Sequence, residues 1–280
     1  MTDVPRRRAA LITGAASGIG RATAELFAER GWWIGAADRN LDGLHALQSK
    51  LGYERCAVWQ LDVTDIDAYR SVVAEVGRHT GGQLDLLYNN AGIAAGGFFD
   101  EVPIEEHLRV IDVNLIGVLN GIYSALPLLK ATPNSLCFST SSAAATYGSP
   151  GLASYAATKF AVKGMTEALA VEFSRFGVRV ADVLPGVVDT AIFTESPVYV
   201  GGERISTADL PTAAETAPPD GPSRLVPPSM VADAVWACYD GDDRMHWYVP
   251  DEVEQIDKAK AVSPETIRDE RIERQRSMLG

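Results

Sequence analysis

Short apolar runs alternate with amphipathic segments along most of the chain. The apolar runs, which we interpret as buried strands, cover residues 9–13, 32–37, 56–61, 84–88, 135–139, 178–184 and 246–249. Segments with helical periodicity cover residues 21–30, 41–51, 65–78, 104–130, 151–176 and 231–239. Strands that alternate with helices over short connections are typical of a parallel sheet with helices on both faces. The pattern therefore predicts an α/β, doubly wound (Rossmann) fold with a mainly parallel seven-stranded sheet.

The chain shows no internal repeat and no linker that would divide it, so we expect a single domain over residues 1–250. Residues 191–228 hold seven of the fifteen prolines and little periodicity. A loop of this length inside a compact domain is often a lid, and we expect a substrate lid here. Residues 251–280 are charged and of mixed sign, which predicts an appended C-terminal tail with a short helix from Pro264 onward.

Composition narrows the classes of partner. The formal net charge of −12 argues against nucleic acid and anionic membrane surfaces, since both favour basic proteins. Cys56, Cys137 and Cys238 are far apart and have no metal-ligand spacing, so we expect a reducing cytoplasm, no disulfide framework and no metal site. No run reaches about 18 uninterrupted apolar residues, and we therefore expect no membrane span and no signal peptide.

Three glycines lie between the first strand and the first helix, in the order Gly14-x-x-x-Gly18-x-Gly20. Glycine lets the backbone adopt a positive φ and approach a ligand closely. The N-terminus of the following helix offers backbone N–H groups and the positive end of a dipole to a pyrophosphate, and Ser17 and Ile19 of the turn are further candidate cofactor contacts. The alternative interpretation is a tight strand-to-helix turn that binds nothing.

Asp38 follows the second strand, eighteen residues after Gly20. A carboxylate there can accept hydrogen bonds from the adenosine ribose and would repel a 2′-phosphate, which favours NAD over NADP. Arg39, the next residue, could soften that discrimination. Asp62-Val63 follows the third strand, where it could contact an adenine edge, although Asp62 could equally be an ordinary helix-capping aspartate.

Tyr155 and Lys159 stand at positions i and i+4 of a predicted helix, so their side chains lie on the same face. A phenol titrates near pH 10 and is a poor base at neutral pH, but a nearby ammonium favours the phenolate and lowers its pKa. The pair is therefore a candidate general acid and base. The plainer interpretation is a surface helix with a partly buried ring.

Four motifs occur in order along the chain: Thr13 to Gly20, Asn89-Asn90-Ala91-Gly92, Tyr155-x-x-x-Lys159 and Pro185-Gly186. Together they resemble the short-chain dehydrogenase/reductase family in its compact single-domain form, over about residues 8–250. The resemblance implies an oxidoreductase that transfers a hydride between a nicotinamide dinucleotide and a secondary alcohol or ketone, with Tyr155 as the general acid and base.

The resemblance also implies a catalytic tetrad of Asn114, Ser142, Tyr155 and Lys159. Ser142, thirteen residues before the tyrosine, would hydrogen-bond the substrate oxygen. Lys159 would hold the nicotinamide ribose and lower the phenol pKa, and Asn114 would position a water that links Lys159 to solvent. Further cofactor contacts are implied at Asn89, Ala91, Gly92, Pro185, Gly186, Val188 and Thr190.

The substrate side is less determined. The residues after the fourth strand and after Ser142 are mostly small and apolar, which suggests a lipophilic substrate but is also compatible with plain core packing. The family resemblance implies a homodimer or homotetramer formed by the helices at 104–130 and 151–176. Two other functions remain open: a dinucleotide-binding sensor or scaffold without turnover, and a sugar epimerase or dehydratase like the family's extended relatives.

Overall fold

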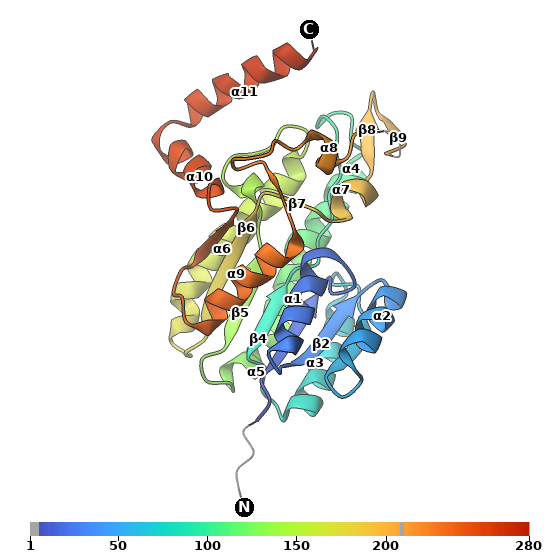
Figure 1. Ribbon diagram of the computed structural model, residues 1–280, viewed down its shortest axis with the longest axis vertical. Coiled ribbons are helices and arrows are strands. Elements are labelled where there is room, and N and C mark those ends of the chain that lie inside the picture. The colour runs from blue at the N-terminus through green and yellow to red at the C-terminus, as the bar shows by residue number, and fades with distance from the viewer. Residues whose placement is uncertain (1–5, 208–209, 280) are drawn as a thin grey trace, which may run out of the picture.

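A computed structural model describes residues 6–207 and 210–279 (Figure 1). Its centre is a seven-stranded sheet in the order β11-β6-β5-β4-β1-β2-β3, and every neighbouring pair is parallel. The strands are β1 (Ala9–Thr13), β2 (Trp33–Asp38), β3 (Cys56–Gln60), β4 (Leu86–Asn89), β5 (Leu136–Thr140), β6 (Arg179–Pro185) and β11 (His246–Val249). The doubly wound fold and the seven strands predicted from the sequence are therefore confirmed.

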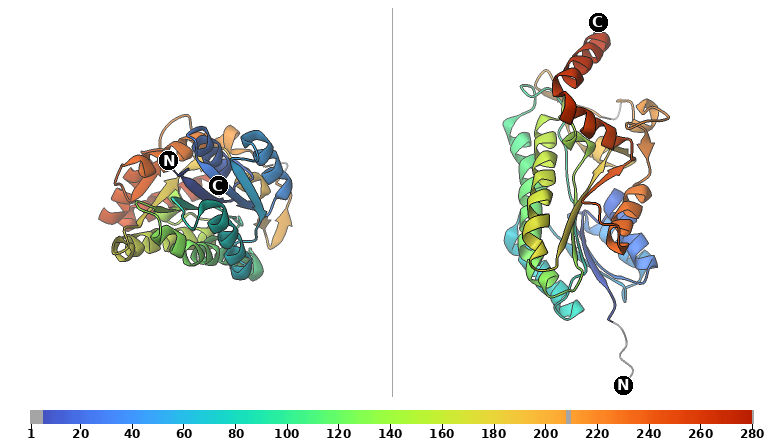
Figure 2. Two further views of the ribbon diagram at one scale, coloured as in Figure 1. Left: turned by 90° about the horizontal axis from the view of Figure 1, so that it is seen from below. Right: turned by 90° about the vertical axis from the view of Figure 1, so that its left-hand side faces the viewer.

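Helices cover both faces of the sheet (Figure 2). One face carries α1 (Gly18–Glu29), α2 (Leu41–Leu51) and α9 (Pro228–Asp240), packed over a core that includes Phe27 and Trp32. The other carries α3 (Ile66–Thr80), α4 (Ile104–Ile111), α5 (Gly117–Lys130) and α6 (Ala153–Ser174). Apolar residues on both faces of each central strand are fully buried, as parallel strands between two helical layers require.

Strand order reverses beside β1, because β2 lies on one side of it and β4 on the other. The connections from the two halves of the sheet then leave in opposite directions and open a crevice at the carboxyl ends of the strands. The ends of β1, β2 and β4 meet there, and each carries one of the predicted motifs.

The expected helix over 104–130 is continuous but changes its winding in the middle. Residues Asp112–Ile116 form a π-helical turn, η1, between α4 and α5. Such turns insert one extra residue into a helix and are frequent at functional sites. By length and composition alone this stretch could cross a membrane. In the fold it packs against α3, β4, β5 and α6, and its buried residues belong to the core.

The proline-rich region 191–228 folds into short elements that are held mainly by tertiary contacts. They are α7 (Ile192–Glu195), β8 (Val198–Val200), β9 (Glu203–Ile205), α8 (Ala213–Thr216) and β10 (Leu225–Val226), which pairs with β7 (Val187–Val188). β8 and β9 form an antiparallel hairpin. The Tyr199 amide donates to the Gly96 carbonyl at 2.8 Å, so the region is attached to the loop that follows β4. Residues 208–209 lie outside the described part of the chain.

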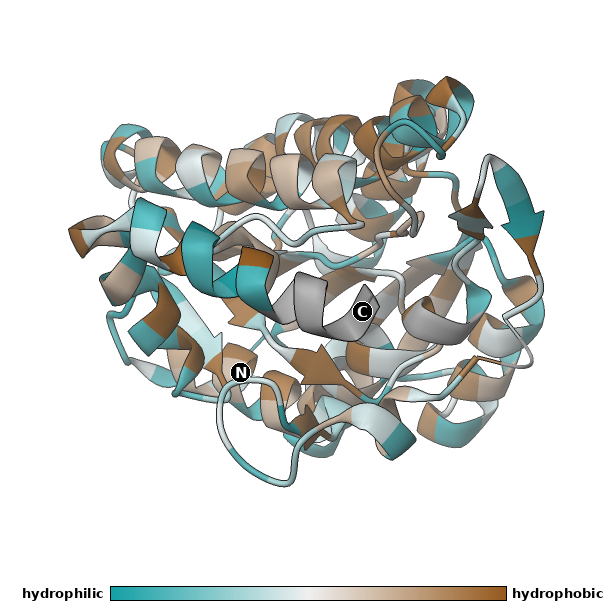
Figure 3. Ribbon diagram, turned by 90° about the horizontal axis from the view of Figure 1, so that it is seen from above, coloured by the Kyte–Doolittle hydropathy of each residue, from teal (hydrophilic) through white to brown (hydrophobic). Residues whose placement is uncertain are grey.

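The region expected to be a charged tail contains two helices, α10 (Val253–Val262) and α11 (Pro264–Leu279). Val253 is fully buried, and Asp257 of α10 accepts hydrogen bonds from Lys163 of α6 and from Tyr248 of β11. α11 is mostly hydrophilic (Figure 3) and projects from the end of the molecule where the strands terminate (Figures 1 and 2). The first of the two helices thus packs on the domain, and the second extends beyond the carboxyl ends of the strands.

Candidate active site

A cavity of about 650 Å³ lies at the carboxyl ends of the strands. It brings together most of the side chains singled out in the sequence. The predicted residues that line it are Gly14, Ser17, Gly18, Ile19, Asp38, Arg39, Asp62, Val63, Ala91, Gly92, Ser142, Tyr155, Lys159, Pro185, Gly186, Val188 and Thr190. Gly20, Asn89 and Asn114 are not in its lining, and they lie behind the cavity wall.

The glycine turn has the backbone shape that a nucleotide loop needs. Gly14 and Gly18 have φ of +65° and +51°, a region that side chains with a Cβ rarely adopt. Gly20 is there for packing, because a Cβ at this position would stand 2.2 Å from the Gly14 carbonyl oxygen. Ser17 begins α1 without a side-chain capping bond, and the first turn holds no acidic residue. The positive end of the helix dipole therefore faces the cavity uncompensated, which suits a phosphate.

Asp38 lies beside the glycine turn at the end of β2. One carboxylate oxygen accepts from the Ala16 amide at 3.1 Å and the other from the Asn40 amide at 2.9 Å. These backbone bonds fix the direction of the carboxylate at the cavity wall. A carboxylate in this place has lone pairs for the hydroxyls of a ribose and presents a negative charge to any 2′-phosphate.

Asp62 lines the cavity and also holds the turn before α3, but it is not the cap of that helix. Its carboxylate accepts from the backbone and hydroxyl of Thr64, at 3.0 and 2.7 Å, and it still lines the cavity. It also pairs with Arg39 at 3.7 Å. Burial raises the pKa of this carboxyl, but the Thr64 hydrogen bonds and the Arg39 charge together hold it below its ordinary value. The N-cap of α3 is the next acidic residue, Asp65.

Two consecutive asparagines at the end of β4 have different surroundings. Asn89 is buried, where its amide contacts Tyr69 and Ser139. Asn90 instead lines the cavity and donates to the carbonyls of Thr13 and Gly14, at 3.0 and 3.3 Å. Asn90 thus holds the glycine turn against β4, a contribution that the sequence reading did not assign. Alternation along the strand is the signal that would have separated the two residues.

Ser142 and Tyr155 face each other across the inner end of the cavity. Ser142 ends the segment after β5 and begins a short 3₁₀ turn, η2 (Ala143–Ala145), where its Oγ accepts from the Ala144 amide at 3.1 Å. Tyr155 lies in the first turn of α6. Burial raises the pKa of the Tyr155 phenol, and its interaction with the Ser142 hydroxyl acts in the opposite direction. The sequence predicted that Lys159 lowers the pKa of Tyr155. In the protein without cofactor, burial has the larger effect and raises this pKa.

Lys159 is 97% buried, with 3% of its surface exposed, one helical turn after Tyr155. Its Nζ donates to the Thr140 carbonyl at 2.9 Å and lies 5.5 Å from the centre of the Tyr155 ring. Burial lowers the pKa of this ammonium to about 8. Lys159 is therefore charged at neutral pH with little margin.

Asn114 sits in the π-helical turn and is fully buried. Its side-chain amide both accepts from the Ile93 N–H and donates to the Ile93 carbonyl, each at 2.9 Å. A Cβ added to Gly92 would stand 3.3 Å from Asn114 Oδ1 and 3.6 Å from Lys159 Nζ. Asn114 and Lys159 therefore both border the space beside Gly92 that a side chain at that position would fill.

The strand end at Pro185-Gly186 closes the cavity on the side of the Pro-rich region. The Gly186 amide donates to the Val249 carbonyl at 2.7 Å, which fixes this turn to β11. Thr190 packs against the glycine turn, because a Cβ at Gly18 would stand 3.0 Å from its methyl group. The two ends of the predicted dinucleotide site are thus in contact.

Several cavity residues could not be found from local sequence patterns. Thr140 receives the Lys159 ammonium, and Arg109, Ile256 and Arg271 come from α4, α10 and α11. The Arg271 guanidinium lies 4.6 Å from the Tyr147 ring centre and donates to the Gly148 carbonyl at 3.1 Å. The helices of the expected tail therefore contribute to the outer wall of the cavity.

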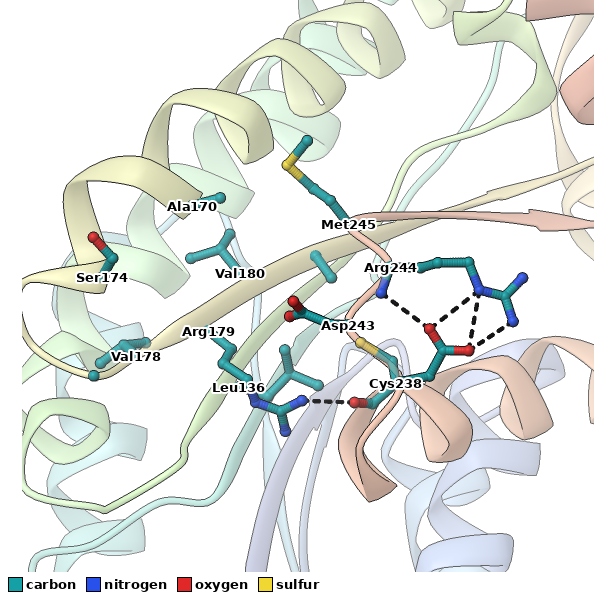
Figure 4. Close-up of a pocket in the computed structure, with 13 residues that line it drawn as sticks. Leu136, Ala170, Ser174, Val178, Arg179, Val180, Cys238, Asp243, Arg244 and Met245 are labelled. Atoms are coloured by element: carbon teal, nitrogen blue, oxygen red, sulfur yellow. Dashed lines mark hydrogen bonds and ion pairs between the residues drawn. The ribbon is translucent and has the colours of Figure 1, made fainter.

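A second cavity, of about 340 Å³, lies at the opposite edge, where β5 and β6 begin (Figure 4). Arg179 crosses it and donates to the carbonyls of Cys238 and Tyr239 at the C-terminal end of α9, at 2.7 and 3.0 Å. Cations at this end of a helix stabilise it. None of the predicted site residues lies here, and the arrangement is explained by helix capping.

Comparison with known proteins agrees with the geometry. A short chain dehydrogenase family model matches residues 8–198. The chain is 38% identical over 189 residues to a 3-oxoacyl-[acyl-carrier-protein] reductase of Thermotoga maritima, covering 67% of this chain and 76% of that protein.

Two solved structures extend the comparison to bound cofactors. A 3-ketoacyl-(acyl-carrier-protein) reductase from Brucella melitensis complexed with NADH is 25% identical, with a TM-score of 0.74 over 87% of this chain and 97% of that chain. An alcohol dehydrogenase from Thermococcus sibiricus complexed with 5-hydroxy-NADP is also 25% identical, with a TM-score of 0.70 over 87% and 94%. These likenesses support a nicotinamide dinucleotide as the cofactor and do not decide between its two forms. On its family match, its fold and its dinucleotide-shaped crevice, the chain belongs to the short-chain dehydrogenase family of oxidoreductases.

Proposed function

We propose that the protein is an alcohol dehydrogenase or ketoreductase that acts on CH–OH groups, with NAD favoured as the hydride acceptor. The observation that carries this proposal is the convergence of Ser142, Tyr155 and Lys159 in the cavity that also holds the glycine turn and Asp38. A binding protein without turnover would need the glycine turn and Asp38 but not the other three residues.

The residues present fit a dinucleotide. The pyrophosphate would lie at the N-terminus of α1, the adenosine ribose at Asp38, and the nicotinamide between Val188 and Thr190. Bound there, the nicotinamide supplies hydride acceptance or donation, which no side chain can provide. The chain's own residues then have to orient the alcohol and move one proton.

The four tetrad residues divide that work. Ser142 would donate to the substrate oxygen, and Tyr155 would take its proton or return it. Lys159 would bind the nicotinamide ribose and, as a cation beside the phenol, favour the phenolate. Asn114 would support Lys159 from behind through the Ile93 and Gly92 backbone, and would position a water that leads to solvent. Burial raises the pKa of the Tyr155 phenol, so the proposed proton transfer depends on the positive charge of Lys159 beside it.

The substrate class follows from the inner wall of the cavity. Apart from the tetrad, this wall is formed mainly by small or apolar side chains, including Ala94, Leu152, Ile192 and Val198. We infer a lipophilic secondary alcohol or ketone. Because two of the similar proteins are 3-oxoacyl thioester reductases, such a thioester belongs among the first compounds to test. The substrates of the epimerase and dehydratase alternatives would require a nucleotide-sugar lobe, whereas the described residues after Gly186 form short strands and helices together with α9, α10 and α11.

We also propose that the enzyme is a cytoplasmic homodimer or homotetramer, acting on small molecules and not on nucleic acid or membranes. Large apolar side chains are exposed along α4, η1, α5 and α6, at Ile104, Leu108, Ile116, Leu119, Tyr123 and Val171. We call these six side chains the apolar stripe; the five from α4 to α5 recur at helical spacing, and exposed apolar side chains of this kind favour a protein contact.

The decisive test is turnover by the wild-type protein and by Tyr155→Phe. A panel of secondary alcohols such as 1-phenylethanol and cyclohexanol is followed with NAD at the NADH absorbance band, and acetoacetyl-CoA is followed in reduction. We expect turnover of at least one compound, and a loss in Tyr155→Phe of at least about 100-fold, because proton transfer is removed while packing is kept. NADH binding, measured by fluorescence, should be retained in the variant. Normal turnover by Tyr155→Phe would refute the mechanism, and NADH binding without any turnover would favour the sensor alternative.

A further inference from the structure

His107 of α4 connects the loop after β4 to the first turn of α6. Its Nδ1 lies 2.7 Å from Ser154 Oγ, and its Nε2 lies 3.1 Å from the Phe99 carbonyl oxygen. The ring stacks on the Phe99 ring with centres 4.7 Å apart and an angle of 26° between planes. Only 9% of the surface of His107 is exposed, and both of its hydrogen bonds are part-buried.

The two partners determine the tautomer of this histidine. A carbonyl oxygen can only accept, so Nε2 must carry the hydrogen that it donates to Phe99. In the neutral ring Nδ1 is then an acceptor, and the Ser154 hydroxyl donates to it. Each of the three groups has one defined role, and the Ser154 side chain is held in a single direction.

That direction matters because Ser154 directly precedes Tyr155. Neighbouring residues on a helix project about 100° apart, so a helix whose Ser154 is fixed toward α4 also has a fixed direction for Tyr155. The start of α6 has no side-chain cap, since Leu152 stands at the N-cap position. Its first turn therefore depends on tertiary contacts for its orientation.

The other end of the connection lies at the substrate side of the cavity. The loop that carries Phe99 also carries Ala94 and Gly96, which line the cavity, and its Gly97 amide donates to the Gly151 carbonyl at 3.0 Å. Tyr155 packs beside Ile93 of the same loop in a small apolar cluster with Val110 and Tyr199. One histidine thus ties together the loop that would touch substrate and the helix turn that carries the proposed base.

We propose that His107 is a positioning residue for Tyr155, acting through the Ser154 hydroxyl. The inference rests on the proposed function, since it concerns the geometry of the proton-transferring tyrosine. Catalysis is sensitive to such positions, and a displacement of about 1 Å can reduce a rate by about 100-fold. Loss of this connection should lower kcat while the cofactor, most of whose proposed contacts lie on other elements, keeps its affinity.

Two variants remove the same hydrogen bond from opposite ends. His107→Phe keeps an aromatic ring against Phe99 and loses both hydrogen bonds, and Ser154→Ala loses only the hydroxyl. If His107 acts through Ser154, the double variant should be no slower than the slower single variant, because interacting sites are not additive. Ser174→Ala is the matched control, since Ser174 lies at the far end of the same helix and donates to the Val171 carbonyl.

The experiment measures kcat and KM with the best compound of the alcohol panel, NADH affinity by fluorescence, and the midpoint of thermal unfolding. We expect kcat to fall roughly tenfold in each single variant, with NADH affinity unchanged and Ser174→Ala like the wild type. His107→Gln, whose amide can donate and accept, should recover part of the loss.

Three results would overturn the inference: wild-type kcat in Ser154→Ala, multiplicative losses in the double variant, or losses that follow thermal stability alone. Should His107→Phe fail to fold, Ser154→Ala and His107→Gln still decide. A wild-type protein without turnover would instead refute the proposed function, so the two failures are distinguishable.

Discussion

At the scale of single residues, the candidate site depends on a balance between burial and charge. Burial raises the pKa of the Tyr155 phenol and lowers the pKa of the Lys159 ammonium to about 8. Both shifts favour neutral groups, since desolvation always disfavours the charged form. The protein alone therefore holds a neutral acid beside a weakly held cation, and in the proposed oxidation the positive charge of the bound nicotinamide would favour the phenolate.

Asp38 leads to a prediction about cofactor choice. Wild-type protein should bind NADH more tightly than NADPH, because the carboxylate accepts from the ribose and repels a 2′-phosphate. Asp38→Asn should lose about 10-fold or more in NADH affinity, as expected for hydrogen bonds to a charged acceptor. The same change should improve NADPH binding, since Arg39 remains beside it. Fluorescence titration with both nucleotides gives the ratio.

Asp62→Asn is the control for that titration. Its carboxylate is engaged by Thr64 and Arg39, so we expect a smaller change in NADH affinity and little change in the preference between nucleotides. Tighter NADPH binding by the wild type would contradict the argument from Asp38. A loss in Asp62→Asn as large as that in Asp38→Asn would show that Asp62 contacts the adenosine more than it caps the turn.

Residue-level prediction succeeded where a residue type had a local reason to be in its place. Gly14 and Gly18 could be assigned from the turn, because positive φ leaves few alternatives. Asn90 was missed in favour of Asn89, because only the register of β4 decides which of two neighbours faces the crevice. His107 had no local signal, since its partners Phe99 and Ser154 come from different elements.

At the scale of elements, the strands and long helices were predictable because each is locally amphipathic or apolar. The short elements within 191–228 were not predictable, because they depend on contacts with other parts of the chain. β8 is bound to Gly96 and β10 pairs with β7. The packing of α10 on the domain was not predicted, because its charged composition is typical of an exposed segment. Its attachment depends on Asp257 meeting Lys163 and Tyr248, which lie on α6 and β11.

A buried pair on β6 and β11 makes stability depend on pH. His246 Nδ1 lies 2.7 Å from Asp182 Oδ1, and Glu167 and Lys163 of α6 face the same site. Burial lowers the pKa of His246, but the hydrogen bond and charge of Asp182 outweigh burial and raise it above 6.5. The folded state thus keeps a proton that the unfolded chain releases. This contribution is fully present below about pH 6.5 and is lost as pH rises through the folded pKa.

His246→Gln should remove that dependence. We expect the free energy of unfolding of the wild type to fall relative to the variant as the pH rises above about 6.5, by about 1.4 kcal/mol for each unit of pKa shift. Urea unfolding at several pH values measures the difference. Lys159 titrates in both proteins, so its contribution cancels, whereas Asp182 is coupled to His246 and the difference reports the pair. Parallel curves for the two proteins would show that His246 is not protonated in the folded state.

At the scale of the whole molecule, the crevice and the exposed apolar stripe lie on different sides of the fold. The crevice opens at the carboxyl ends of the strands, with α10 and α11 at its outer wall. The stripe runs along the outer helical layer on α4, η1, α5 and α6, the same layer whose inner side holds Tyr155, Lys159 and Asn114. Association through this layer would leave the crevice open and would restrain the helix that carries the proposed base.

The stripe predicts the assembly state. In a twofold interface each residue appears twice, so a charge placed at Tyr123, whose surface is 70% exposed, would be buried twice. An aromatic anchor contributes about 2 kcal/mol, and two copies correspond to roughly a 1,000-fold weaker dimer. Sedimentation velocity should show a wild-type dimer or tetramer, and Tyr123→Asp should shift it toward smaller species.

Tyr53→Asp is the control, because Tyr53 is similarly exposed, at 75%, but lies between α2 and β3, away from the stripe. Equal masses for all three proteins would show that the stripe is not the interface, and a monomeric wild type would refute the proposed assembly.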